Sequence, residues 1–391
     1  MRIAIISHNI VRYGSGQGKV TYELVRYLLE KGYFVDLYGE TVDANLIQHN
    51  KIKFFIIKIP QKPAIIRNIL FLIIINWRLK IIKRKRAEYY DIIHIDSGCT
   101  TTDFWDISTC HYCHNRSKKY EKGIYHRFCA IVNSWSEKWM YKKLTIPESF
   151  GNNNMQSRKN IIAVSKKLKD DLQEYIGIDP KRINIIHNGV DLEEFTPDNR
   201  DISRQRVLDS YLAGTTDSNS FIMLFVGDLI KRKGIDLLLN AMKQMPPDIK
   251  LLIVGQERIS YINKVAEYGM ENNIKFIGFQ SNIAKIYKGA DILVVPSLYD
   301  SFGNVVLEAM ACGTPVIVSK FAGSSEIISD GINGLTFDTF EELVEKMELL
   351  YKSRDLYKSI SIKARETAVK YSWTAMATAV EKVYLSMLNQ D

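Results

Sequence analysis

Two acidic side chains eight positions apart carry the most specific chemical signal in this sequence. Asp300 follows an apolar run that ends at Pro296, and Glu308 lies in the helical pattern that comes next. At the start of such a helix, backbone N–H groups lack partners within the helix, so the turn can bind phosphate or sugar oxygens. Glu308 can accept hydrogen bonds from a diol. The candidate ligand-binding residues of this turn are Ser301, Phe302, Gly303, Asn304 and Val305.

The alternative interpretation of this window is structural. Asp300 would be an N-terminal helix cap, and Glu308 a solvated helix residue. Each acid alone favours that interpretation, whereas their joint spacing around Gly303 favours a ligand site, because glycine lets a ligand approach the backbone closely. A metal site is not predicted, since no Asp-x-Asp pair with apolar flanks occurs in the sequence.

A basic pair, Arg232 and Lys233, lies between a predicted strand and a predicted helix. Arginine binds a diphosphate bidentately and lysine adds a point charge, so the pair suits a diphosphate group. The alternative is a solvated basic turn, since runs of charge usually face water.

A glycine-rich loop, formed by Gly14, Ser15, Gly16 and the two residues that follow, comes after the first predicted strand. Its spacing is Gly-x-Gly-x-Gly rather than the Gly-x-Gly-x-x-Gly of dinucleotide-binding proteins. This difference argues against an NAD-dependent oxidoreductase.

The segment from Cys110 to His114 contains Cys-x-x-Cys-His and leaves three interpretations open. Haem attachment matches the pattern but requires export, and the N-terminus reads as a strand rather than a signal peptide. Zinc matches the spacing of Cys110 and Cys113, although no second ligand pair is obvious. The third interpretation is a histidine, His111 or His114, at the end of a strand.

Strand-like and helix-like apolar patterns alternate along the chain, which predicts an α/β protein with doubly wound parallel sheets. The strands predicted in the second half include Phe221–Val226, Ile249–Val254 and Ile274–Phe279. The succession fits two Rossmann-like units that face a central cleft, with ligands beyond the carboxyl ends of the strands. The predicted parts are a first Rossmann-like domain over 1–195, a polar linker or insertion over 196–220, a second Rossmann-like domain over 221–370 and a final helix over 371–391.

These motifs resemble the retaining family 4 of nucleotide-sugar glycosyltransferases, which has the GT-B fold. The resemblance rests mainly on the window from Asp300 through Glu308 to Ala-Cys-Gly-Thr-Pro, with Asp300 standing where Glu is commoner. It implies that Asp300 and the amides of 302–304 bind the donor sugar, that Glu308 binds the ribose and that Arg232 and Lys233 neutralise the diphosphate. It also implies that the glycine loop lies near the donor phosphate, and that a histidine lies beside the reacting sugar, with His111 preferred to His114. The resemblance further implies that 1–195 is the acceptor-side domain, that 221–370 is the donor domain and that the final helix crosses back to the first domain. No metal or other cofactor is implied.

Charge is unevenly distributed along the chain. The whole sequence has 53 Lys and Arg against 44 Asp and Glu, while residues 1–190 alone have 31 against 17, a net charge of +14. The basic first half predicts an anionic partner such as a saccharide acceptor linked to a lipid, or a membrane surface. The apolar stretch 64–82, followed by four basic residues, fits either a buried helix or a helix at a membrane surface. Nucleic acid is not predicted, because no recognised binding module occurs.

We therefore expect a retaining, metal-independent hexosyltransferase that uses a UDP- or GDP-sugar in polysaccharide or glycolipid synthesis. Five cysteines and the absence of a signal peptide predict a cytoplasmic chain, peripheral on the inner face of the membrane if 64–86 contacts lipid. The alternatives are a nucleotide-sugar epimerase of similar fold and a nucleotide-sugar-binding protein without catalysis.

Overall fold

The computed structural model divides the chain into two compact units, Met1–Gly189 with Trp373–Asp391, and Val190–Ser372. It describes residues 1–12, 16–60, 66–67, 70–71, 73–75, 77–78, 90–96, 107–111, 113, 120, 124–141, 159–212 and 220–389. The first boundary follows Gly189, six residues before the end predicted for the first domain. The chain returns to the first unit at Trp373, two residues after the predicted start of the final segment.

The first unit is built on a parallel sheet, whose described strands run in the order β5-β3-β1-β6-β7-β8-β9. Neighbouring strands that are parallel require crossovers, and continuous apolar runs such as the one in β1 suit a sheet covered on both faces. The strand bounds are β1 Arg2–Ile6, β3 Phe34–Gly39, β5 Ile52–Ile56, β6 Ile92–Asp96, β7 Ile107–Cys110, β8 Asn160–Ala163 and β9 Ile183–Ile185, with a small second sheet of β2 Asn9–Ile10 and β4 Thr41–Val42.

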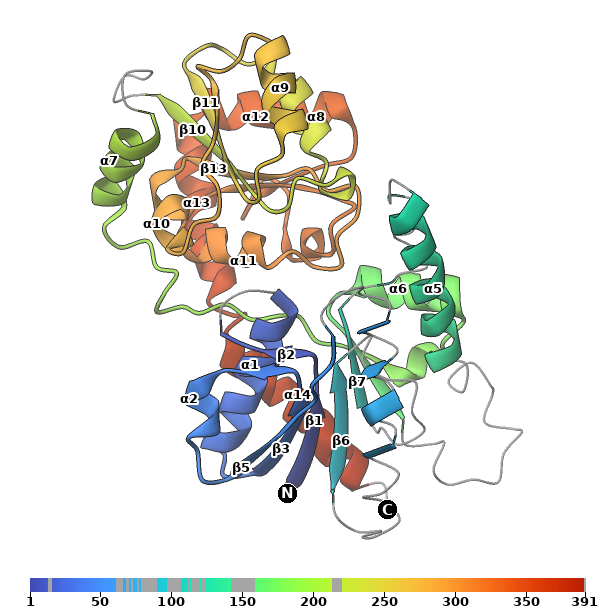
Figure 1. Ribbon diagram of the computed structural model, residues 1–391. Helices are drawn as coiled ribbons and strands as arrows, with labels where there is room; N and C mark the ends of the chain where they lie inside the picture. The colour runs from blue at the N-terminus through green and yellow to red at the C-terminus, as the bar shows by residue number, and fades with distance from the viewer. Residues whose placement is uncertain are drawn as a thin grey trace. The chain divides into compact units, whose positions relative to one another are not determined.

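The helices described in the first unit include α1, near the N-terminus, and α14, near the C-terminus (Figure 1). The last helix, α14, packs against α1. The contact is polar as well as apolar, because the hydroxyls of Tyr27 and Tyr33 donate to Glu381 at 2.6 and 2.5 Å. The helix bounds are α1 Gly16–Glu30, α2 Ala44–Ile47, α5 Ile124–Tyr141, α6 Lys166–Ile176, the short η4 Pro180–Arg182, and α14 Trp373–Leu388.

The stretch predicted as a buried or membrane-surface helix is helical at each of its described positions, 66–67, 70–71, 73–75 and 77–78. Phe71 and Ile75 are fully buried, whereas Ile73 and Trp77 are 58% and 63% exposed. The stretch therefore has a buried face and an exposed apolar face. The basic residues 83–86 lie outside the described residues. No helix in the described parts of the chain combines the length and the apolar character needed to cross a bilayer.

The second unit contains a parallel sheet whose described strands run β12-β11-β10-β13-β14-β15. Strand order reverses direction between β10 and β13, and this is the point where open α/β sheets bind ligands. The bounds are β10 Phe221–Val226, β11 Ile249–Val254, β12 Ile274–Phe276, β13 Ile292–Val295, β14 Val316–Ser319 and β15 Leu335–Phe337.

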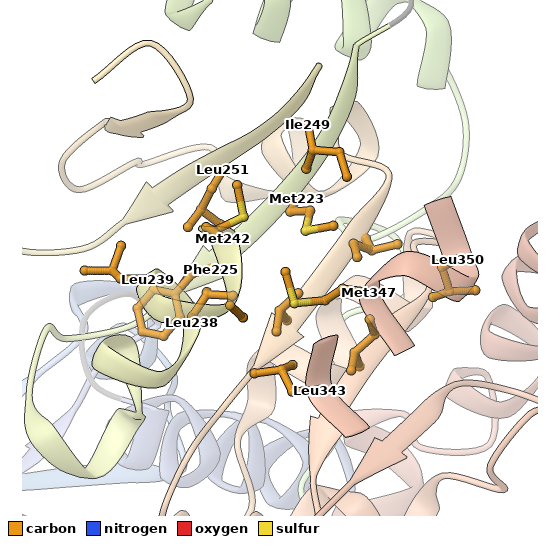
Figure 2. Packing of buried hydrophobic residues seen from close by; sticks show 14 of the residues in the cluster. Met223, Phe225, Leu238, Leu239, Met242, Ile249, Leu251, Leu343, Met347 and Leu350 are labelled. Atoms are coloured by element: carbon orange, nitrogen blue, oxygen red, sulfur yellow. The ribbon is translucent and has the colours of Figure 1, made fainter. Parts of the chain in front are cut away.

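Helices cover this sheet and bury a continuous apolar core. Figure 2 shows part of it, where side chains of β10 and β11 meet Leu238 and Leu239 of α8 and Leu343 and Met347 of α12. The remaining bounds are η5 Lys231–Lys233, α8 Ile235–Met242, α9 Ile259–Glu267, α10 Ile283–Gly289, α11 Asn304–Ala311, η6 Gly323–Ile327, α12 Phe340–Lys352 and α13 Arg354–Ala368.

The segment predicted as a linker, 196–220, contains a helix, α7 Arg200–Tyr211, that belongs to the second unit. Arg200 donates to the carbonyl of Ala290 at 2.7 Å, and Arg204 bonds the carboxylate of Asp291 at 2.8 Å. The polar composition that indicated a linker therefore reflects arginines that bind α7 to the end of α10, and residues 213–219 lie outside the described residues.

Candidate functional site

The loop that follows β10 is held against the loop that follows β13. The carbonyl of Arg232 accepts hydrogen bonds from the amides of Leu298 and Tyr299, at 2.8 and 3.2 Å. Gly234 has a φ of +71°, and a Cβ at this position would lie 1.8 Å from the carbonyl oxygen of Pro296. Only glycine permits this approach. The contact places Arg232 and Lys233 beside the loop that leads into α11.

Lys233 and Asp300 form an ion pair at this junction. The Lys233 ammonium contacts Asp300 Oδ2, and the two side chains are 18% and 12% exposed. Burial works to raise the pKa of Asp300, but Lys233, Arg232 and the amide of Phe302 together hold that pKa below its ordinary value. Asp300 is therefore ionised near neutral pH, when a carboxylate acts only as an acceptor of hydrogen bonds.

The N-cap of α11 is Gly303, with a φ of +88° and no side-chain cap. Asp300 is thus not the cap of this helix, which excludes the structural interpretation of its position. A Cβ at residue 303 would lie 3.4 Å from Asp300 Oδ2 and 3.5 Å from Ser324 Oγ. Glycine keeps this space open between the acid and the helix start.

Glu308 lies one turn into α11 and is half-buried. Its Oε2 accepts a 2.9 Å hydrogen bond from the hydroxyl of Tyr287, a fully buried residue of α10. Burial and the neighbouring Glu308 raise the pKa of Tyr287 well above its ordinary value, so the phenol remains a donor. Glu308 is therefore a positioned acceptor and not a solvated helix residue. Sequence analysis did not identify Tyr287.

A second short helix supports the turn. The amide of Gly323 donates to the carbonyl of Asp300, and the amide of Ser324 to that of Phe302, both at 2.9 Å. Glu326, in the same short helix, is exposed. The main chain around Asp300 is thus fixed by η6 as well as by η5.

The remaining predicted residues of the turn differ in exposure. The side chains of Ser301 and Phe302 are buried, while Asn304 and Val305 at the start of α11 are half-buried. The amide of Phe302, predicted to bind the donor sugar, is instead bonded to Asp300, and its carbonyl accepts from Ser324. Arg232 is half-buried beside Lys233, so the structure brings together all the residues predicted from 232 to 308 at one edge of the second sheet.

In the first unit, His111 directly follows β7, at the carboxyl edge of the sheet. Its Nε2 lies 3.1 Å from Oδ1 of Asp96, the last residue of the neighbouring strand β6. Asp96 was not among the predicted site residues. Its signal in the sequence is an acid at the end of an apolar strand, a position where parallel sheets carry functional groups.

Other predicted residues of the first unit are only partly covered. Gly14, Ser15 and His114 lie outside the described residues, and Gly16 is the first residue of α1. Cys110 and Cys113 are buried and reduced. Among the described residues, no three His, Cys, Asp or Glu side chains are grouped so that they could hold a metal ion.

The second unit therefore offers a chemically defined site. Two cationic side chains, a helix N-terminus and two carboxylates are fixed at the strand ends, with Asp300 and Glu308 as acceptors for hydroxyl groups. Such a set can bind a diphosphate through the cations and a sugar or ribose through the acids.

Family models match both halves of the chain. "Glycosyltransferase Family 4" matches residues 14–194, and "Glycosyl transferases group 1" matches residues 213–367. An uncharacterized glycosyltransferase of Methanocaldococcus jannaschii is 32% identical over 57% of this chain and 59% of its own length. A D-inositol 3-phosphate glycosyltransferase of Mycolicibacterium vanbaalenii is 36% identical over 41% of this chain and 38% of its own length. The chain thus matches well under two thirds of the length of these curated relatives.

Solved structures match the fold over nearly the whole chain. WaaG, a glycosyltransferase involved in lipopolysaccharide biosynthesis, has a TM-score of 0.75 at 18% identity and covers 98% of this chain and 99% of its own. Sucrose-phosphate synthase from Thermosynechococcus elongatus has a TM-score of 0.77 at 21% identity, and both chains are fully covered. Anabaena HepE in complex with UDP-glucose has a TM-score of 0.70 at 17% identity, with 99% and 100% covered. Two family models that between them match most of the chain, and two parallel-sheet units of the GT-B type, place the protein in glycosyltransferase family 4.

Proposed function

We propose that the protein is a retaining hexosyltransferase that moves a sugar from a UDP- or GDP-sugar to a hydroxyl of a saccharide or lipid-linked acceptor. The observation that carries the proposal is the fixed group of Arg232, Lys233 and Asp300 beside the N-terminus of α11. Fixed positive charge at this position stabilises the negative charge that develops on a departing diphosphate.

The proposed reaction uses these groups and no metal ion. The bond between the anomeric carbon and the diphosphate oxygen breaks, and the acceptor oxygen bonds to the same face of that carbon. The acceptor proton passes to an oxygen of the leaving diphosphate, so the products are the new glycoside and a nucleoside diphosphate. Asp300 binds hydroxyls of the donor sugar, Glu308 binds the ribose, and His111 contacts the reacting sugar.

The relatives support the class of donor. The structure of Anabaena HepE, which shares the fold of this chain, contains UDP-glucose. We assign a nucleoside diphosphate sugar to this chain on that basis, together with the cationic pair in the second unit. The identity of the sugar is a matter for the experiment below.

We also propose that the first unit meets an acceptor at an anionic membrane on its cytoplasmic side. The net charge of +14 over 1–190 and the exposed apolar side chains Ile73 and Trp77 support this assignment. Basic charge and apolar side chains act together at a lipid surface. Co-sedimentation with vesicles tests it: binding to vesicles with phosphatidylglycerol but not to neutral vesicles is expected, and equal absence from both pellets contradicts it.

The function is tested with a panel of UDP-, GDP- and ADP-sugars, first by thermal stabilisation and then by transfer to candidate acceptors in the presence of EDTA. One donor should stabilise the protein and yield a product with the anomeric configuration of the donor. Conversion of the donor to an epimer would indicate an epimerase, and stabilisation without turnover a binding protein. Either result contradicts the proposal.

Variants then test the site. Lys233→Ala and Glu308→Ala should each lower transfer by a factor of about 100 or more, since each removes an interaction with donor charge or ribose. The matched control is Lys231→Ala, because Lys231 belongs to the same short helix η5 but is exposed. Equal activity of Lys233→Ala and Lys231→Ala would refute the assignment of the cationic pair.

A further inference from the structure

A buried carboxylate, Asp96, joins three elements of the first unit. It ends β6 and is 1% exposed. Its Oδ2 accepts hydrogen bonds from Ser7 at the end of β1, at 2.8 Å, and from Thr21 of α1, at 2.9 Å. Both hydroxyls use the same oxygen. The carboxylate is therefore held in one orientation, with the other oxygen directed elsewhere.

The second oxygen faces an imidazole. Oδ1 of Asp96 lies 3.1 Å from Nε2 of His111, on the adjacent strand end. The two atoms are buried and close but do not form an aligned hydrogen bond, and a small rotation of the ring would complete one. Hydrogen bonds of this kind are often poorly aligned in ligand-free enzymes and tighten in the complex.

The charge state of Asp96 determines which of the two atoms carries the hydrogen. Burial works to raise the pKa of Asp96, but His111, Ser7 and Thr21 hold it below its ordinary value. The nearby His94 is neutral, because burial lowers its pKa to about 4. Asp96 is therefore an anion that only accepts hydrogen bonds, and His111 Nε2 must carry the hydrogen. In the neutral ring, Nδ1 then holds the lone pair.

We propose that Asp96 is a positioning residue, which holds His111 as its Nε2–H tautomer so that Nδ1 accepts a hydrogen bond from a sugar hydroxyl. This inference rests on the proposed function, since it requires that His111 contacts a sugar. Packing alone does not explain the acid. A neutral amide would satisfy Ser7 and Thr21 equally well, without the cost of burying a charge.

The tautomer is measured first, without any substrate. In ¹⁵N-labelled ligand-free protein, the ring nitrogens of His111 are assigned by their loss in His111→Gln, among seven histidines in the chain. We expect the Nε2–H form in the wild type, and a shift toward Nδ1–H in Asp96→Asn, because the carboxamide can donate to Nε2. A wild-type ring in the Nδ1–H form overturns the proposal, whether or not the variant folds.

Kinetics measure the consequence. Asp96→Asn should lower kcat by a factor of about 10–100 and leave the donor KM within about threefold, the range typical of groups that orient a functional histidine. In the His111→Gln background, Asp96→Asn should cause no further loss. An undiminished loss in that background would mean that Asp96 acts independently of His111 and would overturn the proposal.

Asp36→Asn is the matched control. Asp36 is a buried acid of the same sheet, 2% exposed, and its carboxylate bonds Arg2. Its loss should lower the melting temperature without changing kcat or the tautomer of His111. If no nucleotide sugar gives transfer, the proposed function fails, and the tautomer measurement still decides the role of Asp96.

Discussion

Replacing Lys233 by methionine leaves a buried carboxylate without its main cation. Loss of one partner of a buried ion pair costs roughly 3–5 kcal/mol. Arg232 remains beside Asp300, and the lysine side chain is 18% exposed, so we expect a cost below that range, about 2–3 kcal/mol. In a unit of this size, each kcal/mol of lost stability lowers the melting temperature by about 2–4 °C. We therefore expect the melting temperature of the second unit to fall by roughly 5–10 °C.

The cost should depend on pH in a defined direction. In the wild type the pKa of Asp300 lies below its ordinary value. Ionised Asp300 therefore stabilises the fold at any pH above the ordinary pKa of an aspartate. This contribution is lost as pH falls through the folded-state pKa. Without Lys233, burial favours the protonated acid, and the variant has no such stability to lose. The difference between wild type and Lys233→Met should therefore be largest at pH 7 and shrink below about pH 4.

Scanning calorimetry at pH 7 and at pH 3.5 measures both effects. Lys231→Met is the control for loss of an exposed charge in η5 and should change the melting temperature little. The double variant Lys233→Met/Asp300→Asn should recover most of the stability at pH 7, because no unpaired charge remains. A single variant as stable as the wild type at pH 7, or a double variant no better than the single, would refute the reasoning.

Three further predictions concern other positions. His94 has a pKa of about 4 in the folded state, so the free energy of unfolding should fall as pH drops from about 6.5 to 4, by roughly 3 kcal/mol in a denaturant titration, and His94→Gln should remove this dependence. Gly234→Ala should prevent the close approach to Pro296 and lower both the melting temperature and donor binding, whereas Gly269→Ala, which has a positive φ but open space, should lower the melting temperature less and leave donor binding unchanged. The fully buried thiol of Cys312, whose pKa burial raises to about 12, should resist alkylation at pH 8 in native protein, while the half-buried Cys129 reacts before it in mass-spectrometric mapping.

The sheet of the second unit was well predicted because its strands are marked at both ends. Phe221–Val226 and Ile249–Val254 have the predicted bounds, and each ends at a glycine with positive φ, Gly227 or Gly255. The strand predicted over Ile274–Phe279 ends at Phe276. It lies at the edge of the sheet, where pairing with one neighbour extends over only three residues.

Elements without a clean apolar period were harder to predict. Helix α7 buries only a narrow stripe, Ser203, Val207 and Leu208, and is otherwise polar. Its attachment depends on arginines that bond main-chain carbonyls almost 90 positions away. A local pattern carries no information about such partners, so composition alone indicated a linker.

The candidate site was also predicted only in part. Arg232, Lys233, Asp300 and Glu308 were predicted because each follows a strand at the carboxyl edge of one sheet. Tyr287, the partner of Glu308, and Asp96, which contacts His111, were not predicted, because their contacts depend on elements far apart in the sequence. Asp96 and His111 become neighbours only when β6 and β7 pair.

The pairing of Lys233 with Asp300 also changes what the two residues can do. Sequence analysis gave them separate tasks, the lysine for the diphosphate and the acid for the sugar. An ammonium has three donors, so Lys233 can bind Asp300 and a phosphate oxygen at once. The carboxylate then fixes the position of the cation before the donor arrives, and little reorganisation is needed when negative charge develops. Because Gly303 leaves open space beside the same carboxylate, one fixed anion can orient both the lysine and a sugar hydroxyl.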